Sequence, residues 1–349
     1  MHTTKQVTWQ SPSNIALIKY WGKHGNQLPN NASISFTMEN CYSETTLSIE
    51  PKLSTSKEIE LRFYFDKKEN LAFRIKIIQF FESIHKEFSF LRDYSIIVNS
   101  MNSFPHSSGI ASSASAMSAL ALCLCSMDDM LNKRKIPKDK FFERASTIAR
   151  IGSGSAARSV YPTMVSWGKF KKIKGSSDKF ATECGDWIHP VFKTFQNSIL
   201  IASGDEKKVS SRVGHSLMEK NPFAPARYKQ AEDNMNELIK ALMVGDLEQF
   251  GEIVESEALT LHALMMCSKP SYTLMTPNTL AMIEAIRDFR ESSKLPLYFT
   301  LDAGPNIHLL YPKKIQSKVQ EFIDLELKQY CENGRIIFDQ VGKGPKLIK

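Results

Sequence analysis

Few cysteines and histidines occur in the 349-residue sequence, and neither type forms a recognisable metal or disulfide pattern. The six cysteines include no Cys-x-x-Cys pair and have no histidine nearby at zinc-finger spacing, and the eight histidines include no His-x-x-x-His pair. We therefore expect reduced thiols in the core of a cytoplasmic protein, and no metal site made by protein side chains alone. Glycine and proline together make up less than a tenth of the chain, which excludes collagen-like and low-complexity disordered proteins.

A long hydrophobic run is also missing. The longest apolar stretch, around Ala116–Cys125, is interrupted by Ser118 and is shorter than the roughly 20 residues that cross a bilayer. We therefore expect a buried helix of a soluble protein and no membrane partner. Met1–Gln6 contains no apolar segment of the kind that a secretory signal needs, so no such signal is expected.

Acidic residues are the minority among the charged ones. The chain has 45 lysines and arginines against 37 aspartates and glutamates, a formal charge of +8, which favours anionic partners. Nucleic acid, acidic lipid and a phosphorylated metabolite all satisfy this preference. The basic cluster Lys169–Lys179 is the main argument for nucleic acid, but its lysines do not alternate with aromatic residues and no recognised nucleic-acid motif is present. We therefore expect no nucleic-acid partner.

The length of the chain predicts two lobes, because a single hydrophobic core usually stops growing at about 250–300 residues. In the first half, strand patterns occur at Thr45–Glu50, Glu60–Phe65, Tyr94–Asn99 and Met164–Gly168, and helices are predicted over Leu71–His85 and from about Ser112 to before Lys133. The mixture of strands and helices is typical of an α/β lobe.

The second half begins with a predicted strand at Ser198–Ser203 and continues with three amphipathic helices. Apolar residues at helical spacing place the three helices around 235–242, 250–261 and 282–289, and Asp246 and Thr276 are their expected N-caps. Two paired strands, 296–301 and 307–311, follow. We place the boundary near residue 188, giving lobes 1–187 and 188–349, and predict an α+β fold with a cleft between the lobes.

The loop Phe104–Ser115 consists largely of small residues and leads into a predicted helix. Small residues let backbone N–H groups approach a ligand, and the helix N-terminus favours an anion, most naturally a phosphate. The loop lacks the Gly-Lys-Ser/Thr ending of a Walker motif. A serine-capped helix packed against a neighbour explains the pattern equally well.

Three further segments carry groups suited to chemistry. Ser11–Lys23 ends in cationic and aromatic residues after an apolar run, although snorkelling lysines on an amphipathic strand explain its spacing better. Gly152–Ser159 leads through serines to an arginine near an expected helix start, where an anion site and an ordinary loop are both possible. Asp302 begins a turn after a strand, which is the commoner role of such an aspartate, although a carboxylate there could act as a base.

The order and identity of these motifs resemble those of the diphosphomevalonate decarboxylases, members of the GHMP kinase superfamily. The matching segments, from the N-terminus onward, are NIALIKYWGK (14–23), PHSSGIASSA (105–114), GSGSAARS (152–159), VSSR (209–212) and DAGPN (302–306). The resemblance extends from about residue 11 to 345. NIALIKYWGK and DAGPN are specific for this enzyme, whereas the loop at 105–114 alone would identify only the superfamily.

The resemblance implies a two-lobed GHMP fold, with a ribosomal-protein-like N-terminal lobe, a ferredoxin-like C-terminal lobe and the active site in the cleft. It implies a cytoplasmic homodimer that uses ATP and Mg²⁺ to phosphorylate the 3-hydroxyl of mevalonate 5-diphosphate. Loss of phosphate and CO2 would then yield isopentenyl diphosphate. Decarboxylation of mevalonate 5-phosphate, or 3-phosphorylation without decarboxylation, remains the alternative within the superfamily.

The resemblance also implies a role for each motif. Asp302 would orient or deprotonate the 3-hydroxyl, Lys19 would lie beside it, and Arg158 would hold the substrate carboxylate. The implied substrate-binding residues are Tyr20, Lys23, Ser153, Ser155, Arg158 and Arg212. The implied ATP-binding residues are Ser107, Ser108, Gly109, Ala111, Ser112 and Ser113, with Mg²⁺ bridging phosphate oxygens. Ala32, His106–Ser108 and Lys343 depart from the usual family residues, but none of them replaces a charged catalytic group.

Overall fold

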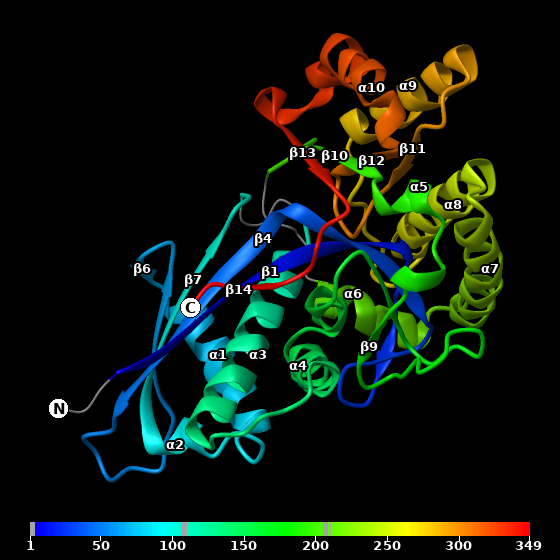
Figure 1. Ribbon diagram of the computed structural model, residues 1–349. Coiled ribbons are helices and arrows are strands. Elements are labelled where there is room, and N and C mark those ends of the chain that lie inside the picture. The colour runs from blue at the N-terminus through cyan, green and yellow to red at the C-terminus, as the bar shows by residue number, and fades with distance from the viewer. Residues whose placement is uncertain (1–3, 106–109, 205–208, 210) are drawn as a thin grey trace.

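The computed structural model describes residues 4–105, 110–204, 209 and 211–349 and consists of two lobes (Figure 1). The first lobe is built on one large sheet, with the order β14-β1-β4-β7-β5-β6 and with β8 and β9 attached beside β4. Its strands are β1 (Lys5–Ile18), β4 (Ser33–Pro51), β5 (Glu60–Phe65), β6 (Lys68–Glu69), β7 (Tyr94–Asn102), β8 (Met164–Trp167), β9 (Ala181–Glu183) and β14 (Lys346–Leu347). The short strands β2 (Lys23–His24) and β3 (Leu28–Pro29) form a separate hairpin.

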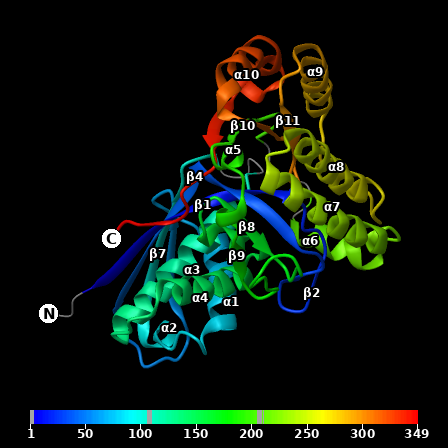
Figure 2. The same cartoon turned by 45° about the vertical axis from the view of Figure 1, so that its right-hand side comes forward.

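Helices pack on one face of this sheet (Figure 1, Figure 2). They are α1 (Leu71–Ile84), α2 (Phe90–Asp93), α3 (Ser112–Leu131) and α4 (Lys138–Gly152), followed by the 3₁₀ segment η1 (Gly154–Val160). The predicted helices at 71–85 and from 112 are confirmed, and so are the predicted strands that fall within β4, β5, β7 and β8. Periodicity succeeded for α1, whose buried residues Ile77, Phe80, Phe81 and Ile84 lie at helical spacing. Helix α3 is instead a largely apolar segment that is buried on most sides.

Helix α3 is long and apolar enough to cross a membrane by length and composition, and among the described helices only α3 meets that test. However, 67% of its most apolar 18-residue window is buried, and its side chains pack with those of α4 and the sheet in the main core of the lobe. The structure therefore confirms the prediction of a buried core helix. All six cysteines are free, and five of them are buried, as expected.

The second lobe contains an antiparallel sheet with the order β11-β12-β10-β13. Its strands are β10 (Gln196–Leu200), β11 (Tyr298–Thr300), β12 (Ile307–Tyr311) and β13 (Ile336–Gln340). Its helices are α5 (Pro190–Lys193), α6 (Ser211–Ser216), α7 (Ala224–Val244), α8 (Leu247–Met266), α9 (Pro277–Ser293) and α10 (Gln316–Phe322). Short helical segments complete it: η3 (Leu217–Lys220), η4 (Lys313–Ile315), η5 (Ile323–Leu327), η6 (Lys328–Tyr330) and η7 (Glu332–Gly334). A further segment, η2 (Gly185–Trp187), directly precedes the expected boundary near residue 188.

The predicted helix starts in this lobe are confirmed by their caps. The Asp246 carboxylate accepts a hydrogen bond from the N–H of Gln249 at 3.0 Å at the start of α8. Thr276 forms a capping box with Thr279 before Pro277 at the start of α9. One strand is displaced from its prediction: β10 ends at Leu200, whereas the sequence pattern continued to residue 203.

An apolar core joins the two lobes. Phe36 on β4 packs against Phe195 and Phe250, with ring centroids 6.0 and 6.3 Å away. The last residues of the chain also connect the lobes, because Leu347 on β14 pairs with Trp9 on β1 in the first sheet (Figure 1). The boundary near residue 188, which falls between β9 of the first sheet and β10 of the second, stays a prediction.

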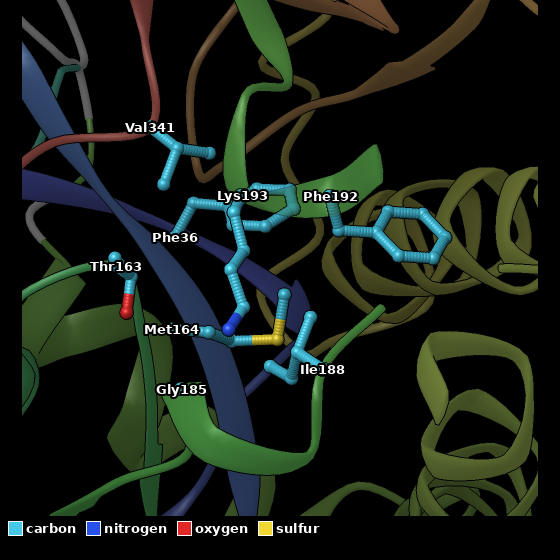
Figure 3. Close-up of a pocket in the computed structure, with 8 residues that line it drawn as sticks. All are labelled: Phe36, Thr163, Met164, Gly185, Ile188, Phe192, Lys193 and Val341. Atoms are coloured by element: carbon cyan, nitrogen blue, oxygen red, sulfur yellow. The ribbon is translucent and has the colours of Figure 1, made fainter. Parts of the chain in front are cut away.

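A small pocket lies at this junction (Figure 3), lined by Phe36, Thr163, Met164, Gly185, Ile188, Phe192, Lys193 and Val341. Its volume of about 10 Å³ leaves room for no more than one water molecule. It is therefore a packing defect between lobes and has no capacity for a substrate.

Candidate active site

A cleft of about 1200 Å³ contains most of the motifs that the sequence singled out. Its walls come from the end of β1, from α1, from the first turns of α3, from the segment between α4 and η1, and from the loop after β11. The predicted residues that line it are Lys19, Tyr20, Lys23, Ala111, Ser112, Ser113, Ser153, Ser155, Arg158 and Asp302. Ser107, Ser108 and Gly109 lie outside the described residues, as does the side chain of Arg212.

Lys19 and Asp302 form an ion pair in the cleft. The Lys19 Nζ atom donates hydrogen bonds to Asp302 Oδ1 at 2.9 Å and to the carbonyl of Ala16 at 2.7 Å. Burial of the Lys19 side chain lowers its pKa below the usual value, although the negative charge of Asp302 acts in the opposite direction. The Asp302 side chain keeps 26% of its surface exposed, so its carboxylate is accessible to a ligand in the cleft.

Arg158 is a buried cation that has hydrogen-bond partners but no carboxylate. Its Nε donates to Asn14 Oδ1 at 3.2 Å, and one terminal nitrogen donates to Ser33 Oγ at 2.5 Å. No carboxylate of the described residues lies within 4.0 Å of its guanidinium, and burial lowers its pKa to about 10. The negative charge of Asp302 offsets the effect of burial only in part. Because a buried charge without a direct ionic partner is costly, this arrangement is suited to an anionic ligand.

The local setting of Arg158 corrects one prediction. The sequence pattern placed Arg158 near the start of a helix, but the residue lies inside η1, which directly follows α4. Gly154 in the same segment leaves room for the neighbouring Tyr20, because an added Cβ atom would lie 2.6 Å from the Tyr20 hydroxyl. The segment is therefore a short 3₁₀ helix that holds Arg158 beside Asn14 of β1.

Tyr20 belongs to an aromatic cluster directly before β2. Its ring centroid lies 4.8 Å from that of Trp167 and 4.3 Å from that of His215, which also contacts Trp21 at 4.5 Å. The His215 Nδ1 atom accepts a hydrogen bond from the N–H of Gly22 at 2.9 Å, so its proton must be on Nε2 when the ring is neutral. Burial and the charge of nearby Lys23 lower the pKa of His215 to about 3, which keeps the ring neutral.

The start of α3 forms the opposite wall of the cleft. Ala111, its N-cap, has a left-handed backbone (φ +49°) and supplies no side-chain cap, so among the described residues no side chain caps the amides of the first turn. Ser113 lies close to the α4–η1 segment, with its Oγ 3.4 Å from that of Ser153. The 20-residue helix thus directs its N-terminus toward the same space as Arg158, which favours a phosphate group there.

Charge and polarity differ along the cleft. Of the described residues that line it, Asp302 alone is acidic, whereas Lys19, Lys23, Lys76 and Arg158 are basic. The far end is apolar and aromatic, lined by Phe63, Phe65, Phe73, Phe80 and Val98. The cleft is therefore suited to a ligand with both a flat apolar part and several negative charges.

The described residues contain no group of three or more His, Cys, Asp or Glu that could hold a metal ion. Mg²⁺ does not require such a cage, because it commonly binds substrate phosphates, water and only one or two protein oxygens. Asp302 and the Ser112 hydroxyl line the space into which α3 points and could supply those oxygens. The residues present therefore fit a magnesium ion carried by a nucleotide.

Several residues of the site were not found from the sequence. Asn14 and Ser33 hold Arg158, Trp167 packs against Tyr20, and His215 holds Gly22. None of these residues stands out in its local segment. Asn14 was included in a matching motif, but its contact with a residue 144 positions later could not be read from spacing.

This two-lobed α+β fold, with a phosphate-attracting helix start facing an Asp–Lys pair across a basic cleft, defines the GHMP kinase class of proteins. Two family models specify the family further. The model of the diphosphomevalonate decarboxylase-like N-terminal domain matches residues 11–181, and that of the mevalonate 5-diphosphate decarboxylase C-terminal domain matches residues 198–335. The chain belongs to the diphosphomevalonate decarboxylase family.

Individual relatives agree with this assignment. The chain is 29% identical over 346 residues to the diphosphomevalonate decarboxylase of Ganoderma lucidum, covering 93% of this chain and 82% of that protein. Its fold matches the mevalonate diphosphate decarboxylase of Staphylococcus aureus with a TM-score of 0.83 at 28% identity, over 99% of both chains. A structure described as MDDEF in complex with MVAPP, AMPPCP and magnesium matches equally well, with a TM-score of 0.83, 28% identity and coverage of 99% and 100%. The two-lobed α+β architecture expected from the sequence is thereby confirmed.

Proposed function

We propose that the protein catalyses the ATP-dependent decarboxylation of mevalonate 5-diphosphate to isopentenyl diphosphate, with release of ADP, phosphate and CO2. The observation that carries this proposal is that the Lys19–Asp302 ion pair and the buried Arg158 line the same cleft. Arg158 has no carboxylate partner in the described structure. Membership of the family and the solved complex with an ATP analogue and magnesium support the same reaction and the use of ATP and Mg²⁺.

Asp302 is the group that would act on the 3-hydroxyl of the substrate. Its exposed carboxylate edge can accept the hydroxyl proton as the oxygen attacks the γ-phosphate of ATP. The Lys19 ammonium, 2.9 Å away, places a positive charge beside the carboxylate and the transferring phosphoryl group. Phosphoryl transfer depends on such positioning and charge neutralisation more than on covalent participation by the protein.

Arg158 would hold the substrate carboxylate for the second step. The bond between C3 and the phosphate oxygen breaks, positive character develops at C3, and the electrons of the carboxylate–C2 bond form the new double bond as CO2 leaves. A guanidinium fixed by Asn14 and Ser33 can align the carboxylate for this elimination. Ser153 and Ser155 are proposed to hold the carboxylate together with Arg158, and Tyr20, Lys23 and Arg212 are proposed to bind the substrate diphosphate.

ATP would lie along the cleft, with its phosphates at the start of α3 and its base in the apolar end lined by Phe63 and Phe73. Mg²⁺ would neutralise phosphate charge in this site. We also propose that the protein is a cytoplasmic homodimer, as the family resemblance implies. Size-exclusion chromatography with light scattering tests the dimer, and a monomer at micromolar concentration would contradict it.

The decisive experiment supplies the purified enzyme with mevalonate, its 5-phosphate or its 5-diphosphate, together with MgATP, and measures ADP and CO2 separately. We expect equal amounts of both products with the 5-diphosphate and little of either with the other two. ADP without CO2 would identify a kinase. A clear preference for the 5-phosphate would instead identify a monophosphate decarboxylase. The Asp302→Ala variant serves as the control for background ATP hydrolysis.

A further inference from the structure

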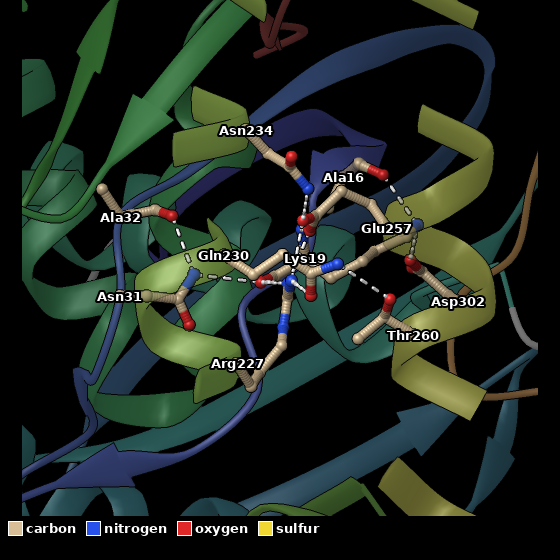
Figure 4. Close-up of polar contacts among 10 residues, drawn as sticks. All are labelled: Ala16, Lys19, Asn31, Ala32, Arg227, Gln230, Asn234, Glu257, Thr260 and Asp302. Atoms are coloured by element: carbon tan, nitrogen blue, oxygen red, sulfur yellow. Dashed lines mark hydrogen bonds and ion pairs between the residues drawn. The ribbon is translucent and has the colours of Figure 1, made fainter. Parts of the chain in front are cut away.

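A second ion pair lies directly behind Lys19 and takes no part in the reaction described above. Glu257 on α8 and Arg227 on α7 are only 0% and 2% exposed, and both terminal nitrogens of Arg227 donate to the Glu257 carboxylate (Figure 4). Asn234, also on α7, donates to the same carboxylate at 2.7 Å. The two helices lie side by side in the C-terminal lobe (Figure 2).

This pair holds the main chain of Lys19. The N–H of Lys19 donates to Glu257 Oε2 at 2.7 Å, and Arg227 donates to the carbonyl of Lys19 at 3.0 Å. Asn31 in the N-terminal lobe donates to the same carbonyl, also at 3.0 Å. Both peptide groups of Lys19, which follows the last residue of β1, are therefore fixed by the opposite lobe, and its side chain is free to reach Asp302.

Stability alone is a poor explanation for this arrangement. Removing two charges from water costs about as much as their attraction returns, so a buried pair is often replaceable by apolar residues without loss of stability. The Nε of Arg227 also has no hydrogen-bond partner in the described part of the chain, which adds a further cost. The pair therefore has a role other than stability, and its hydrogen bonds to the main chain of Lys19 indicate that it acts on this residue.

We propose that Glu257 and Arg227 are positioning residues that fix the main chain of Lys19, so that its ammonium meets Asp302 and the transferring phosphoryl group. This inference rests on the proposed function, because it assigns the effect to the phosphoryl-transfer step. A displacement of about 1 Å at a reacting group can reduce a rate about 100-fold. A loss of the main-chain contacts should therefore lower kcat strongly.

The pair also changes the electrostatics at Lys19. Charged or titratable groups lie near Lys19 on several elements: Asp302 after β11, Glu257 on α8, Arg158 in η1, Arg227 on α7 and His308 on β12. His262 on α8 is hydrogen-bonded to the carbonyl of Asp302 at 3.1 Å. Glu257 raises the pKa of Lys19, while burial lowers it more strongly. Removing the charge of Glu257 leaves that of Arg227 uncompensated, and the opposite substitution leaves Glu257 uncompensated. The two changes should therefore move the pKa of Lys19 in opposite directions.

The test measures kcat against pH for Glu257→Gln and Arg227→Gln, each with saturating MgATP and mevalonate 5-diphosphate. If protonated Lys19 is needed for turnover, kcat falls at high pH, and we call this part of the profile the alkaline limb. The alkaline limb should move to lower pH in Glu257→Gln and to higher pH in Arg227→Gln. A residue that only supports folding would lower the yield of active enzyme without moving this limb. Wild-type kcat together with unshifted limbs in two folded variants would overturn the proposal.

A double variant, Glu257→Leu with Arg227→Met, covers the case in which single variants fail to fold. It removes both charges together, so no buried charge is left unpaired, but the N–H of Lys19 and the side-chain amide of Asn234 lose their acceptor. We therefore expect a folded protein with a lowered melting temperature, because each unpaired donor costs about 1–3 kcal/mol. We expect its kcat to fall by about 10- to 100-fold with the KM for ATP within about twofold of wild type. Wild-type kcat in this folded double variant would contradict the proposal.

The matched control is Glu255→Gln, two positions earlier on α8. Glu255 also forms a bidentate pair with an arginine, Arg290, but it contacts the N–H of Phe299 and not Lys19. We expect this control to lose stability without a shift of the alkaline limb. The wild-type enzyme is assayed in parallel, so that failure of the proposed function can be distinguished from failure of this inference. If the proposed function is wrong, the wild type itself releases no ADP and CO2 from the 5-diphosphate.

Discussion

Substitution of Arg158 by methionine separates folding from catalysis in this enzyme. Burial lowers the pKa of Arg158 from 12.5 to about 10, although the charge of Asp302 acts in the opposite direction, and this corresponds to a penalty of roughly 3 kcal/mol for the charged form in the folded protein. Arg158→Met removes this penalty, but it also leaves the Oδ1 atom of Asn14 without its donor, which costs about 1–3 kcal/mol. The two effects nearly cancel, so we expect the free energy of unfolding of the ligand-free variant to stay within about 2 kcal/mol of wild type.

Catalysis should respond very differently to the same change. A guanidinium that holds the substrate carboxylate by two charge-assisted hydrogen bonds contributes about 1.5–3 kcal/mol for each bond. Loss of both corresponds to roughly 10²- to 10⁴-fold in kcat/KM. The effect should be larger for CO2 release than for formation of the phosphorylated intermediate, because alignment of the carboxylate matters only when C–C cleavage occurs.

Two measurements check this reasoning. ADP and CO2 are quantified with mevalonate 5-diphosphate, and thermal unfolding is recorded with and without the substrate. Substrate at 100 times its Kd should stabilise the wild type by about 2.7 kcal/mol and the variant at the same concentration by much less. A folded Arg158→Met enzyme with kcat/KM within tenfold of wild type, or with equal stabilisation by substrate, would refute the role of Arg158 as the carboxylate partner.

Three further predictions concern other parts of the cleft. Asp302→Ala is expected to lower kcat by about 10²- to 10⁴-fold in a protein that remains folded, and near-normal turnover would remove its assigned role. Gly154→Ala should displace Tyr20, whose hydroxyl would lie 2.6 Å from the new Cβ, and raise the KM for the diphosphate substrate but not for ATP, as steady-state kinetics would show. Burial lowers the pKa values of His215 and His308 to about 3 and about 4, so between about pH 4 and 6.5 the unfolded chain binds more protons than the folded one. The free energy of unfolding should therefore fall as the pH drops through this window, by up to about 1.4 kcal/mol per pH unit for each histidine. In His308→Asn, the difference between the free energies of unfolding measured in urea at pH 7 and pH 5 should be smaller than in the wild type. An unchanged difference would contradict this prediction.

Much of the secondary structure could be predicted because its causes are local. Helix α8, for example, begins at a capping aspartate and has one apolar face, and both features are visible within twenty residues. Helix α4 was not predicted, and its absence from the prediction led to the wrong expectation of a helix start at Arg158. Gly152–Ser159 has no periodicity of its own, so only the preceding helix and the packing of Tyr20 against Gly154 define its shape.

The active-site residues were predictable in type but not in environment. The charged residues of the cleft could be predicted from the motifs and from their order along the chain, because ligands with phosphate and carboxylate groups are bound by such residues. The sequence could not reveal that Arg158 is buried without a carboxylate partner among the described residues, because that depends on which side chains surround it after folding. Nor could it reveal His215, which has no distinctive neighbours along the chain.

The sequence by itself therefore determined the family, the two-lobed α+β class and the identity of the charged groups, since each of these depends on short segments and their order. The tertiary structure decided how those groups act. Lys19 donates its N–H to Glu257, 238 residues later, and this contact exists only because α8 of one lobe packs against the end of β1 of the other. Burial, ion pairing and pKa depend on such distant neighbours, and they are properties of the folded chain alone.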